Sequence, residues 1–217
     1  MVQIGTGPSA FLILAGLHGD EPTGCYVAEH LVGLLAGSVA VPENVSVFVV
    51  TCANPDGRES GKRGNAHGVD LNRNFPASNW RLTRPNSTYG GAKPASEPET
   101  VAVMEIVREL HPALILSIHS IRDGRQCNNY DGPATRPAEL MGRYNGYPVE
   151  ETIGYPTPGS LGSWAGKDLN FPVITLELPR EQSGERAWSR NRDALLAVIG
   201  IEPGKSSATQ PAATSAR

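Results

Sequence analysis

The sequence predicts one α/β domain in which helices flank a twisted, mixed and mostly parallel sheet. Short apolar runs bounded by turn residues are typical of buried strands, and segments of helical period separate them. Alternation of strands and helices favours a parallel sheet covered on both faces. The chain of 217 residues has the length of one domain. We expect that domain over residues 1–202 and a disordered tail, rich in Ser, Ala, Thr, Gln and Pro, over residues 203–217.

The first strong strand is expected at residues 12–17, and it leads directly into the motif HGDE. His18 and Glu21 in this motif combine an imidazole with a carboxylate, and both groups are common ligands of Zn²⁺. A catalytic zinc takes three protein ligands and a water. A loop histidine and a solvated glutamate would have the same spacing, so the assignment requires a third ligand from elsewhere in the chain.

A helix and a second strand are expected after this motif. Apolar residues at positions 27, 31, 34 and 35 form one helical face, and Gly37 ends it. His30 lies inside this helix, where an exposed histidine is more common than a ligand. The β-branched run at residues 45–52 predicts the next strand, and the sequence NPDG at residues 54–57 predicts a turn.

Residues 58–95 have little periodicity and many Gly, Pro, Asn and Arg residues. Loops of this length inside a compact domain are uncommon and are often functional. Arg63 and Arg73 lie here among three asparagines, within residues 62–76. Arginine offers a planar fork of donors that matches a carboxylate, and asparagine adds neutral donors. The segment predicts a site for a substrate carboxylate, with a solvated basic loop as the alternative.

A third strand is expected to supply the missing metal ligand. The sequence SEPE at residues 96–99 predicts a capping box with proline at the second helical position, and the helix that follows ends near His111. The apolar run at residues 113–118 then predicts a strand that ends at His119. Because strand ends of one sheet lie side by side, His119 is the best candidate for the third ligand.

Residues 120–146 are loop-rich, and a short helix is expected near residues 137–144. Residues 155–164 form a loop that proline and glycine stiffen. Tyr155 in this loop is either a mobile group over a site or a packed anchor.

Residues 171–178 predict a further strand with a single acid, Glu177, in an apolar run. Such strands rarely bury an acid without a partner. Glu177 is therefore either exposed at a sheet edge or a functional carboxylate whose surroundings can raise its pKa. Residues 184–199 predict the last helix.

Composition narrows the range of functions. There are 19 Lys and Arg against 22 Asp and Glu, so a net charge of −3 carries no polycationic signal for nucleic acid or an anionic membrane. No run approaches the roughly 20 apolar residues of a membrane span. Three widely spaced cysteines indicate no disulfide framework, and the N-terminus lacks the basic region of a signal peptide. We expect a cytoplasmic protein with a small partner.

Several stretches together resemble the zinc carboxypeptidase superfamily, and within it the murein tripeptide amidases. These stretches are LILAGLHGDE, NPDG, RGNAHGVDLNRNFPASNW, SEPET, GYPTPGSLGSWAG and VITLELP, and they span most of the chain. The murein tripeptide amidases cleave the γ-D-glutamyl–meso-diaminopimelate bond of cell-wall peptides. The resemblance implies a zinc carboxypeptidase-like fold, a zinc-dependent hydrolase and a small substrate, a tripeptide derived from the cell wall.

The resemblance also implies a role for each candidate residue. One zinc ion per chain would be held by His18, Glu21 and His119. Glu177 falls where the family has its general base, and Arg63 falls where it has the arginine that polarises the scissile carbonyl.

Four further positions would bind substrate. Asn72 and Arg73 fall where the family binds the terminal carboxylate, and Tyr155 takes the place of the mobile tyrosine over the pocket. Gly162 lies where family members carry a residue that shapes the specificity pocket, and a glycine there leaves room for a long polar group.

Two alternatives remain open at this point. A zinc deacylase of N-acyl amino acids, of the aspartoacylase or succinylglutamate desuccinylase kind, would also carry H-x-x-E and an Asp-Leu-Asn-Arg stretch. The NRNFP continuation at residues 72–76 and the loop of Tyr155 favour the amidase. A non-catalytic peptide-binding module is the second alternative. Residues 122–147 resemble the amidases poorly and would wall the substrate cleft, and family members carry additional sequence before the first strong strand.

Overall fold

The computed structural model describes residues 1–203, and within them seven strands form one mixed sheet in the order β1-β3-β2-β4-β7-β5-β6. The strands are β1 (Val2–Ile4), β2 (Ser9–Ala15), β3 (Val45–Val50), β4 (Leu114–Ile121), β5 (Cys127–Asp131), β6 (Val149–Glu150) and β7 (Val173–Pro179). The expected mixed α/β sheet is confirmed. The expected tail at residues 203–217 falls, but for its first residue, outside the described residues.

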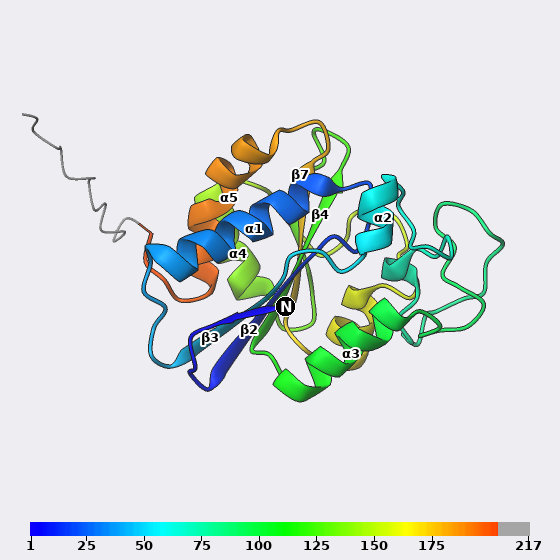
Figure 1. Cartoon of the computed structure of the whole chain (residues 1–217), viewed down its shortest axis with the longest axis horizontal. Coiled ribbons are helices and arrows are strands. Elements are labelled where there is room, and N and C mark those ends of the chain that lie inside the picture. Colours follow the sequence, from blue (N-terminus) through cyan, green and yellow to red (C-terminus); the bar gives the residue numbers. More distant parts are fainter. Residues whose placement is uncertain (204–217) are drawn as a thin grey trace, which may run out of the picture.

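Strands β3, β2, β4 and β7 lie side by side and are parallel to one another. Antiparallel pairing adds β1 beside β3 and β5 beside β7. The carboxyl ends of β2, β4 and β7 consequently meet at one end of the sheet (Figure 1). Ligand sites of open α/β sheets are found at that end of the strands.

Helices cover both faces of the sheet. They are α1 (Pro22–Gly37), α2 (Pro55–Ser60), α3 (Pro98–Leu110), α4 (Thr135–Asn145) and α5 (Gly184–Val198), with a short 3₁₀ helix η1 (Leu71–Arg73) and a π-helical segment η2 (Gly162–Asp168). Helices α1, α4 and α5 pack on one face, and α3 and η2 pack on the other (Figure 1).

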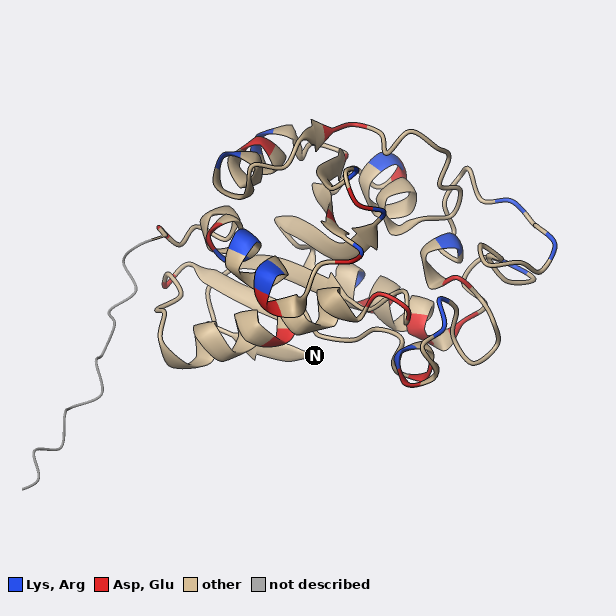
Figure 2. Cartoon of the chain, turned by 90° about the horizontal axis from the view of Figure 1, so that it is seen from above, with Lys and Arg blue, Asp and Glu red and all other residues tan. Residues whose placement is uncertain are grey.

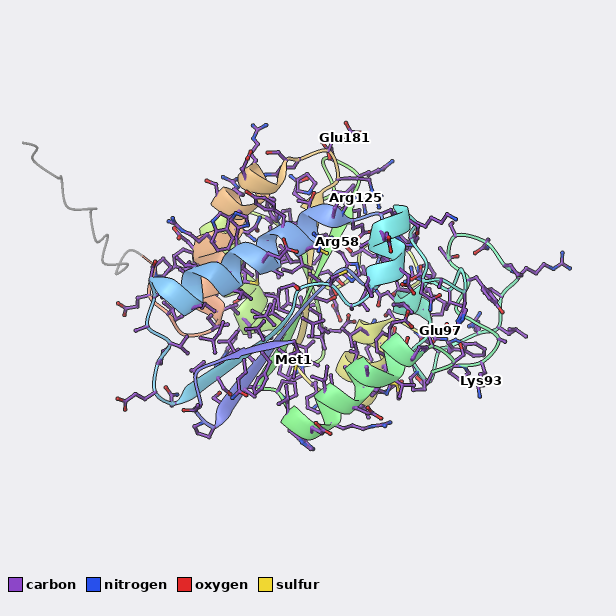
Figure 3. The ribbon with its side chains drawn as sticks, in the orientation of Figure 1. Met1, Arg58, Lys93, Glu97, Arg125 and Glu181 are labelled. Carbon is purple, nitrogen blue, oxygen red and sulfur yellow. The ribbon has the colours of Figure 1, made fainter. Side chains whose placement is uncertain are left out.

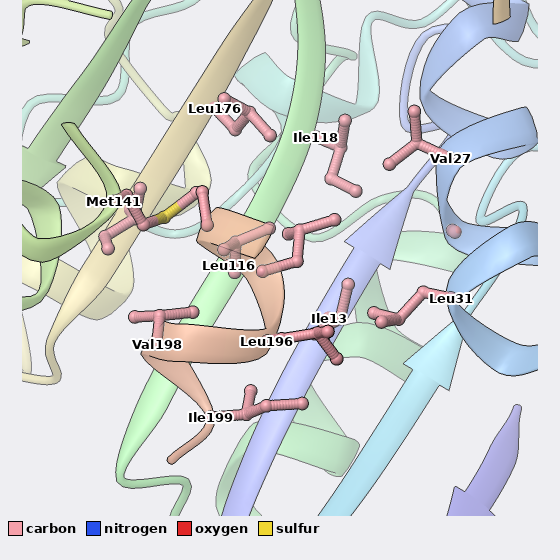
Figure 4. Packing of buried hydrophobic residues seen from close by; sticks show 14 of the residues in the cluster. Ile13, Val27, Leu31, Leu116, Ile118, Met141, Leu176, Leu196, Val198 and Ile199 are labelled. Atoms are coloured by element: carbon pink, nitrogen blue, oxygen red, sulfur yellow. The ribbon is translucent and has the colours of Figure 1, made fainter. Parts of the chain in front are cut away.

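Side chains of alternate strand residues build the two cores, because successive residues of a strand point to opposite faces. Ile13 of β2 packs under α1, whereas Leu12 and Leu14 pack toward α3. Figure 4 shows the first of these cores, in which the strand residues Ile13, Leu116 and Leu176 lie among the helix residues Val27, Leu31, Met141 and Leu196. Both cores bring the strand ends into fixed positions.

The structure corrects three local expectations. Residues 120–146, expected to be loop-rich with a short helix near residues 137–144, contain the strand β5 as well as the whole of helix α4. Residues 54–57 open helix α2, where Asn54 Oδ1 accepts a hydrogen bond from Gly57 N at 2.9 Å. Helix α3 has no capping box, since Pro98 is its first residue and Glu97 precedes it without a side-chain cap.

The sequence of β5, CNNYD, has no apolar pattern. A buried pair of amide side chains, one from β5 and one from α4, takes the place of apolar packing here. Asn128 and Asn145 of α4 each donate to the other's side-chain oxygen, at 3.1 and 2.9 Å. Both side chains are fully buried. Buried polar groups are stable only when hydrogen-bonded, and this pair meets that condition.

Two global expectations can be compared with the structure. In the described part of the chain no helix is long and apolar enough to cross a bilayer. Basic and acidic positions are interspersed along the ribbon (Figure 2), consistent with the small net charge.

Candidate metal and substrate site

The three expected metal ligands converge at the carboxyl end of the sheet. His18 follows β2, Glu21 immediately precedes α1, and His119 lies near the end of β4. His18 Nδ1 is 3.0 Å from Glu21 Oε1 and 3.0 Å from His119 Nδ1, and His119 Nδ1 is 3.2 Å from Glu21 Oε2. All three side chains are buried. One donor atom from each residue lies within 4.8 Å of the other two.

The donor set fits zinc. Neighbouring ligand atoms of a tetrahedral zinc are about 3.3 Å apart, and the three separations here are close to that value. Two imidazole nitrogens that face each other at 3.0 Å cannot both carry a proton, and a cation between them satisfies both lone pairs. Two imidazoles with one carboxylate favour zinc over magnesium or calcium, which prefer oxygen ligands.

Outer partners fix the orientation of both histidines. His18 Nε2 donates to Asp70 Oδ1 at 3.0 Å, and the Nε2 of His119 lies 3.0 Å from Ser117 Oγ. Both Nδ1 atoms therefore point inward. The backbone N–H of Ser120 donates to Glu21 Oε2 at 2.9 Å. Hydrogen-bond partners of this kind fix the tautomer of a metal-binding histidine and increase the affinity of the site for the metal.

Asp70 is a positioning residue that the sequence did not identify. Its Oδ2 accepts from Arg63 Nε at 2.9 Å, so one carboxylate orients both His18 and Arg63. The only sequence signal was an acid that immediately precedes the short 3₁₀ helix η1 in a segment otherwise rich in Arg and Asn.

Charge in this cluster favours a bound cation. Burial opposes ionisation of Glu21, but His18 and His119 hold the pKa of its carboxyl well below the usual value. Burial would lower the pKa of His18, but Glu21 and Asp70 raise it to about 9. Burial lowers the pKa of His119 despite its contact with Glu21. Two ionised carboxylates thus surround the ligand atoms.

Glu177 lies beside the ligand cluster on an inner strand. Strand β7 lies between β4 and β5, and Glu177 is the register partner of His119. Its side chain is 6% exposed, so the alternative of an acid exposed at a sheet edge is wrong. Burial, together with the negative charge of Glu21, raises its pKa to about 7. A carboxyl group with this pKa can accept and release a proton near neutral pH.

A cavity of about 450 Å³ opens over these groups. It is lined by all five of the residues expected to act on substrate, which are Arg63, Asn72, Arg73, Tyr155 and Gly162. It is also lined by four charged residues that the sequence did not single out, which are Arg122, Arg125, Asp131 and Arg180. Arg125 is labelled in Figure 3. The expected wall from residues 122–147 is therefore present.

The arginines of the cavity are held by short contacts. Arg63 NH1 is 3.4 Å from Glu21 Oε1, and Arg73 NH1 donates to Asn72 O at 2.7 Å. Arg180 donates to Glu21 Oε1 at 3.2 Å and to Asp20 Oδ2 at 3.2 Å. Burial lowers the pKa of Arg73, so an anion beside it would be favoured. The cavity suits a substrate with carboxylates.

Asn72 and Tyr155 differ in how freely they can reach a ligand. Asn72 Oδ1 accepts from Leu161 N at 2.9 Å, and its Nδ2 lies 3.4 Å from His119 Nε2. The side-chain amide of Asn72 is therefore held between the start of η2 and His119. Tyr155 is 50% exposed and lies in a loop at the mouth of the cavity.

Sequence comparison identifies the class of protein to which this fold and site belong. Residues 3–137 match the zinc carboxypeptidase family, and the chain belongs to that family. The expectation of a zinc metallopeptidase is thereby confirmed.

Murein amidases are among its relatives, as the motifs indicated. Murein peptide amidase A of Escherichia coli (strain K12) is 39% identical over 186 residues, which cover 80% of this chain and 73% of the relative. Murein peptide amidase A of Vibrio campbellii (strain ATCC BAA-1116) is 31% identical over 208 residues, covering 88% and 78%. The crystal structure of murein-tripeptide amidase from Escherichia coli O157 matches with a TM-score of 0.71 and 34% identity, covering 92% of this chain and 84% of that chain.

Proposed function

We propose that this chain is a zinc-dependent amidase that hydrolyses the γ-D-glutamyl–meso-diaminopimelate bond of murein peptides. The observation that carries the proposal is the convergence of His18, Glu21 and His119 beside buried Glu177. The similarity to murein peptide amidases supports the choice of substrate. The substrate is a small peptide, derived from the cell wall, with several carboxylates.

One zinc ion per chain is proposed, held by His18 Nδ1, His119 Nδ1 and the carboxylate of Glu21. Zinc at this place supplies a Lewis acid that polarises a carbonyl and lowers the pKa of water to about 7. Asp70 keeps the proton of His18 on Nε2, so that Nδ1 remains available.

Glu177 is the proposed general base. Its raised pKa allows the carboxylate to take the proton of the attacking water and to pass it to the leaving amine. Arg63 is the proposed oxyanion donor, because contacts to Asp70 and Glu21 fix its guanidinium at the cavity while further N–H groups remain. Removal of one such donor in other enzymes costs about 10² to 10³ in rate.

Arg73 and Asn72 are proposed to hold the carboxylate next to the scissile bond. This contact would fix the amide over the metal site, and such positioning lowers the entropic cost of reaching the transition state. Tyr155 is proposed to close over the substrate from its exposed loop. Gly162 is proposed to leave space for the long side chain of the leaving residue.

We further propose that the enzyme acts in the cytoplasm. Cys25, Cys52 and Cys127 are free thiols, which are common in reducing compartments. The alternative of an N-acyl amino acid deacylase is not favoured, because the relatives at 39% and 31% identity are murein peptide amidases.

The test is hydrolysis of L-Ala-γ-D-Glu-meso-diaminopimelate by the zinc-loaded full chain, with release of diaminopimelate measured by mass spectrometry. We expect release that stops after removal of the metal with a chelator and returns with zinc. N-acetylaspartate and N-succinylglutamate are tested in parallel as substrates of the alternative deacylase activity. Faster hydrolysis of either one would replace the amidase by the deacylase, and no hydrolysis of any of the three would overturn both.

A further inference from the structure

Two thiols from distant parts of the chain meet over Gly16, the residue that follows β2. A Cβ atom at Gly16 would be 2.8 Å from Cys25 Sγ and 3.2 Å from Cys52 Sγ. The backbone of Gly16 has a φ of 69°, a conformation that glycine adopts without strain. Any other residue here would be strained and would push a sulfur atom away. The fold therefore keeps room at this position for two sulfur atoms.

The two thiols differ in exposure and in charge. Cys25 lies in the first turn of α1 and is 1% exposed, whereas Cys52 follows β3 and is partly exposed. The Cys25 thiol donates to the Cys52 sulfur, and this contact, together with burial, raises the pKa of Cys25. The same contact, with the backbone N–H of Asn54 and the guanidinium of Arg58, lowers the pKa of Cys52 to about 6. Because the thiolate is the nucleophilic form of cysteine, Cys52 is the accessible nucleophile and Cys25 is its protonated partner.

A fixed positive charge lies beside this pair. Arg58 of α2, labelled in Figure 3, contacts the Cys52 sulfur, and its NH1 donates to Glu29 Oε1 at 2.7 Å. Reactive cysteines are found in such partly exposed places next to a cation. The third cysteine has the opposite surroundings, because burial and the charge of Glu177 raise the pKa of Cys127 to about 12. Reaction with an oxidant is therefore directed to Cys52.

Both cysteines lie on segments that hold metal-ligand candidates. Glu21 immediately precedes α1, whose first turn contains Cys25. The segment that follows Cys52 is hydrogen-bonded to the segment that leads into His18, since Asn54 donates to the carbonyl oxygens of residues 16 and 17 at 2.9 and 3.3 Å. A bond between the two sulfur atoms would therefore join the segments that carry Glu21 and His18.

Formation of that bond would change the geometry of both segments. A disulfide holds its sulfur atoms about 2.0 Å apart, which is much closer than two thiols in contact. The first turn of α1 and the end of β3 would have to approach each other by the difference. A displacement of about 1 Å at an active site can cost about 10²-fold in rate. The disulfide form is thus expected to be the less active form.

We propose that Cys52 and Cys25 are a redox-sensitive thiol pair, which hydrogen peroxide converts to a disulfide that reversibly lowers the activity of the adjoining metal site. Disulfides in reducing compartments are commonly of this transient, redox-sensing kind. Disulfide formation and its effect on zinc binding do not depend on the identity of the substrate. Only the loss of peptide hydrolysis rests on the proposed function.

The oxidation proceeds in two steps. The Cys52 thiolate attacks one oxygen of hydrogen peroxide, the O–O bond breaks, and Cys52 becomes a sulfenic acid while hydroxide is released. The charge that mainly held the proton on Cys25 is then gone. The Cys25 sulfur attacks the Cys52 sulfur, and the sulfenic hydroxyl leaves with the Cys25 proton as water. Two electrons pass from the thiols to peroxide, and a dithiol reductant reverses the change by thiol–disulfide exchange.

The test treats the zinc-loaded full chain with hydrogen peroxide at neutral pH and maps its unreduced peptides by mass spectrometry. We expect a cross-linked pair of peptides that contains Cys25 and Cys52 and disappears after treatment with dithiothreitol. Zinc affinity, measured by competition with a chromogenic chelator, should fall by about 10-fold in the disulfide form. The kcat/KM for the murein tripeptide should fall by about 10- to 100-fold and return on reduction.

Cysteine variants separate the two roles. Cys52→Ser should make zinc affinity and activity insensitive to peroxide. Cys25→Ala leaves the sulfenic acid without a partner, so dimedone, which traps sulfenic acids, should label Cys52 more in this variant than in the native chain. Circular dichroism shows whether the buried substitution is tolerated. Cys127→Ala is the matched control and should keep the cross-link and its reversal.

Substitution of Arg58 tests the contribution of the neighbouring charge. Arg58→Met should slow formation of the cross-link, because the pKa of Cys52 rises without the guanidinium. Arg192→Met, at an exposed ion pair on α5, is the matched control and should leave the rate unchanged. Equal slowing by both variants would contradict the role of Arg58.

The outcomes distinguish this inference from the proposed function. Oxidation of Cys52 without a link to Cys25 overturns the inference, and so does a disulfide that leaves both zinc affinity and kcat/KM unchanged. An equal loss of activity in peroxide-treated Cys52→Ser also overturns it, because another residue would then be the target. If the disulfide forms and weakens zinc binding but the reduced chain cleaves no murein peptide, the thiol pair is supported and the proposed function is wrong.

Discussion

Replacement of Asp70 by asparagine should weaken zinc binding without touching a metal ligand. The asparagine oxygen can still accept from His18 Nε2, but its NH₂ group would face Arg63 Nε, which now donates to Asp70 at 2.9 Å. The variant therefore loses one negative charge beside His18 and places two donors opposite each other. Loss of a side chain that orients a metal ligand typically costs 10- to 100-fold in metal affinity, or about 1.4 to 2.7 kcal/mol.

The assay is competition for zinc between the protein and a chromogenic chelator, followed by titration at constant pH. Circular dichroism of the metal-free protein shows whether the fold is retained. Asp193→Asn serves as the control, since it removes an acid of the same kind from an exposed pair. A zinc affinity of Asp70→Asn within about two-fold of the native chain would refute the role of Asp70 in orienting His18.

Three further predictions concern individual residues. Glu177→Gln should retain stoichiometric zinc, measured by metal analysis, and lose at least about 10³-fold in turnover of the murein tripeptide, and unchanged turnover would remove Glu177 from the mechanism. His119→Ala should purify without zinc, because two ligands remain of three, and full occupancy would contradict its assignment. Contact with the thiol of Cys25, aided by Arg58, lowers the pKa of Cys52 to about 6, so its thiolate predominates above that pH. Iodoacetamide at pH 7 should label Cys52 before Cys25 and Cys127, with a rate that falls as the pH drops through 6, and preferential labelling of Cys127 in peptide mapping would contradict this.

Elements whose residues bury an apolar pattern could be predicted from the sequence. The runs that became β2, β4 and β7 are apolar on both faces because helices cover both faces, and such runs stand out without any knowledge of the fold. Their carboxyl ends then had to lie together, so His18 and His119 could be placed near each other from the strand pattern. Glu177 was placed at the site only by the resemblance to the zinc carboxypeptidases, because its strand alone left open an acid exposed at a sheet edge.

Features that depend on partners distant in the chain could not be predicted in this way. Strand β5 consists of Cys, Asn, Asn, Tyr and Asp, and its amide network forms only once α4 has packed beside it. Asp70 has its role through a hydrogen bond with His18, which lies 52 residues earlier. Asp131 fits where it does because the neighbouring residues of η2 are glycines. A polar residue in a loop carries no sequence pattern that reveals such a partner.

The position of β7 inside the sheet has a consequence for how substrate range can change. Glu177 and His119 lie on strands that are hydrogen-bonded on both sides, so the reacting groups share the rigidity of the core. The other residues that line the cavities come from β5, which lies nearer the edge of the sheet, from the π-helical segment and from the loop of Tyr155. Substitutions in these lining segments can therefore change which peptide is bound, while Glu177 and His119 keep their positions in the sheet.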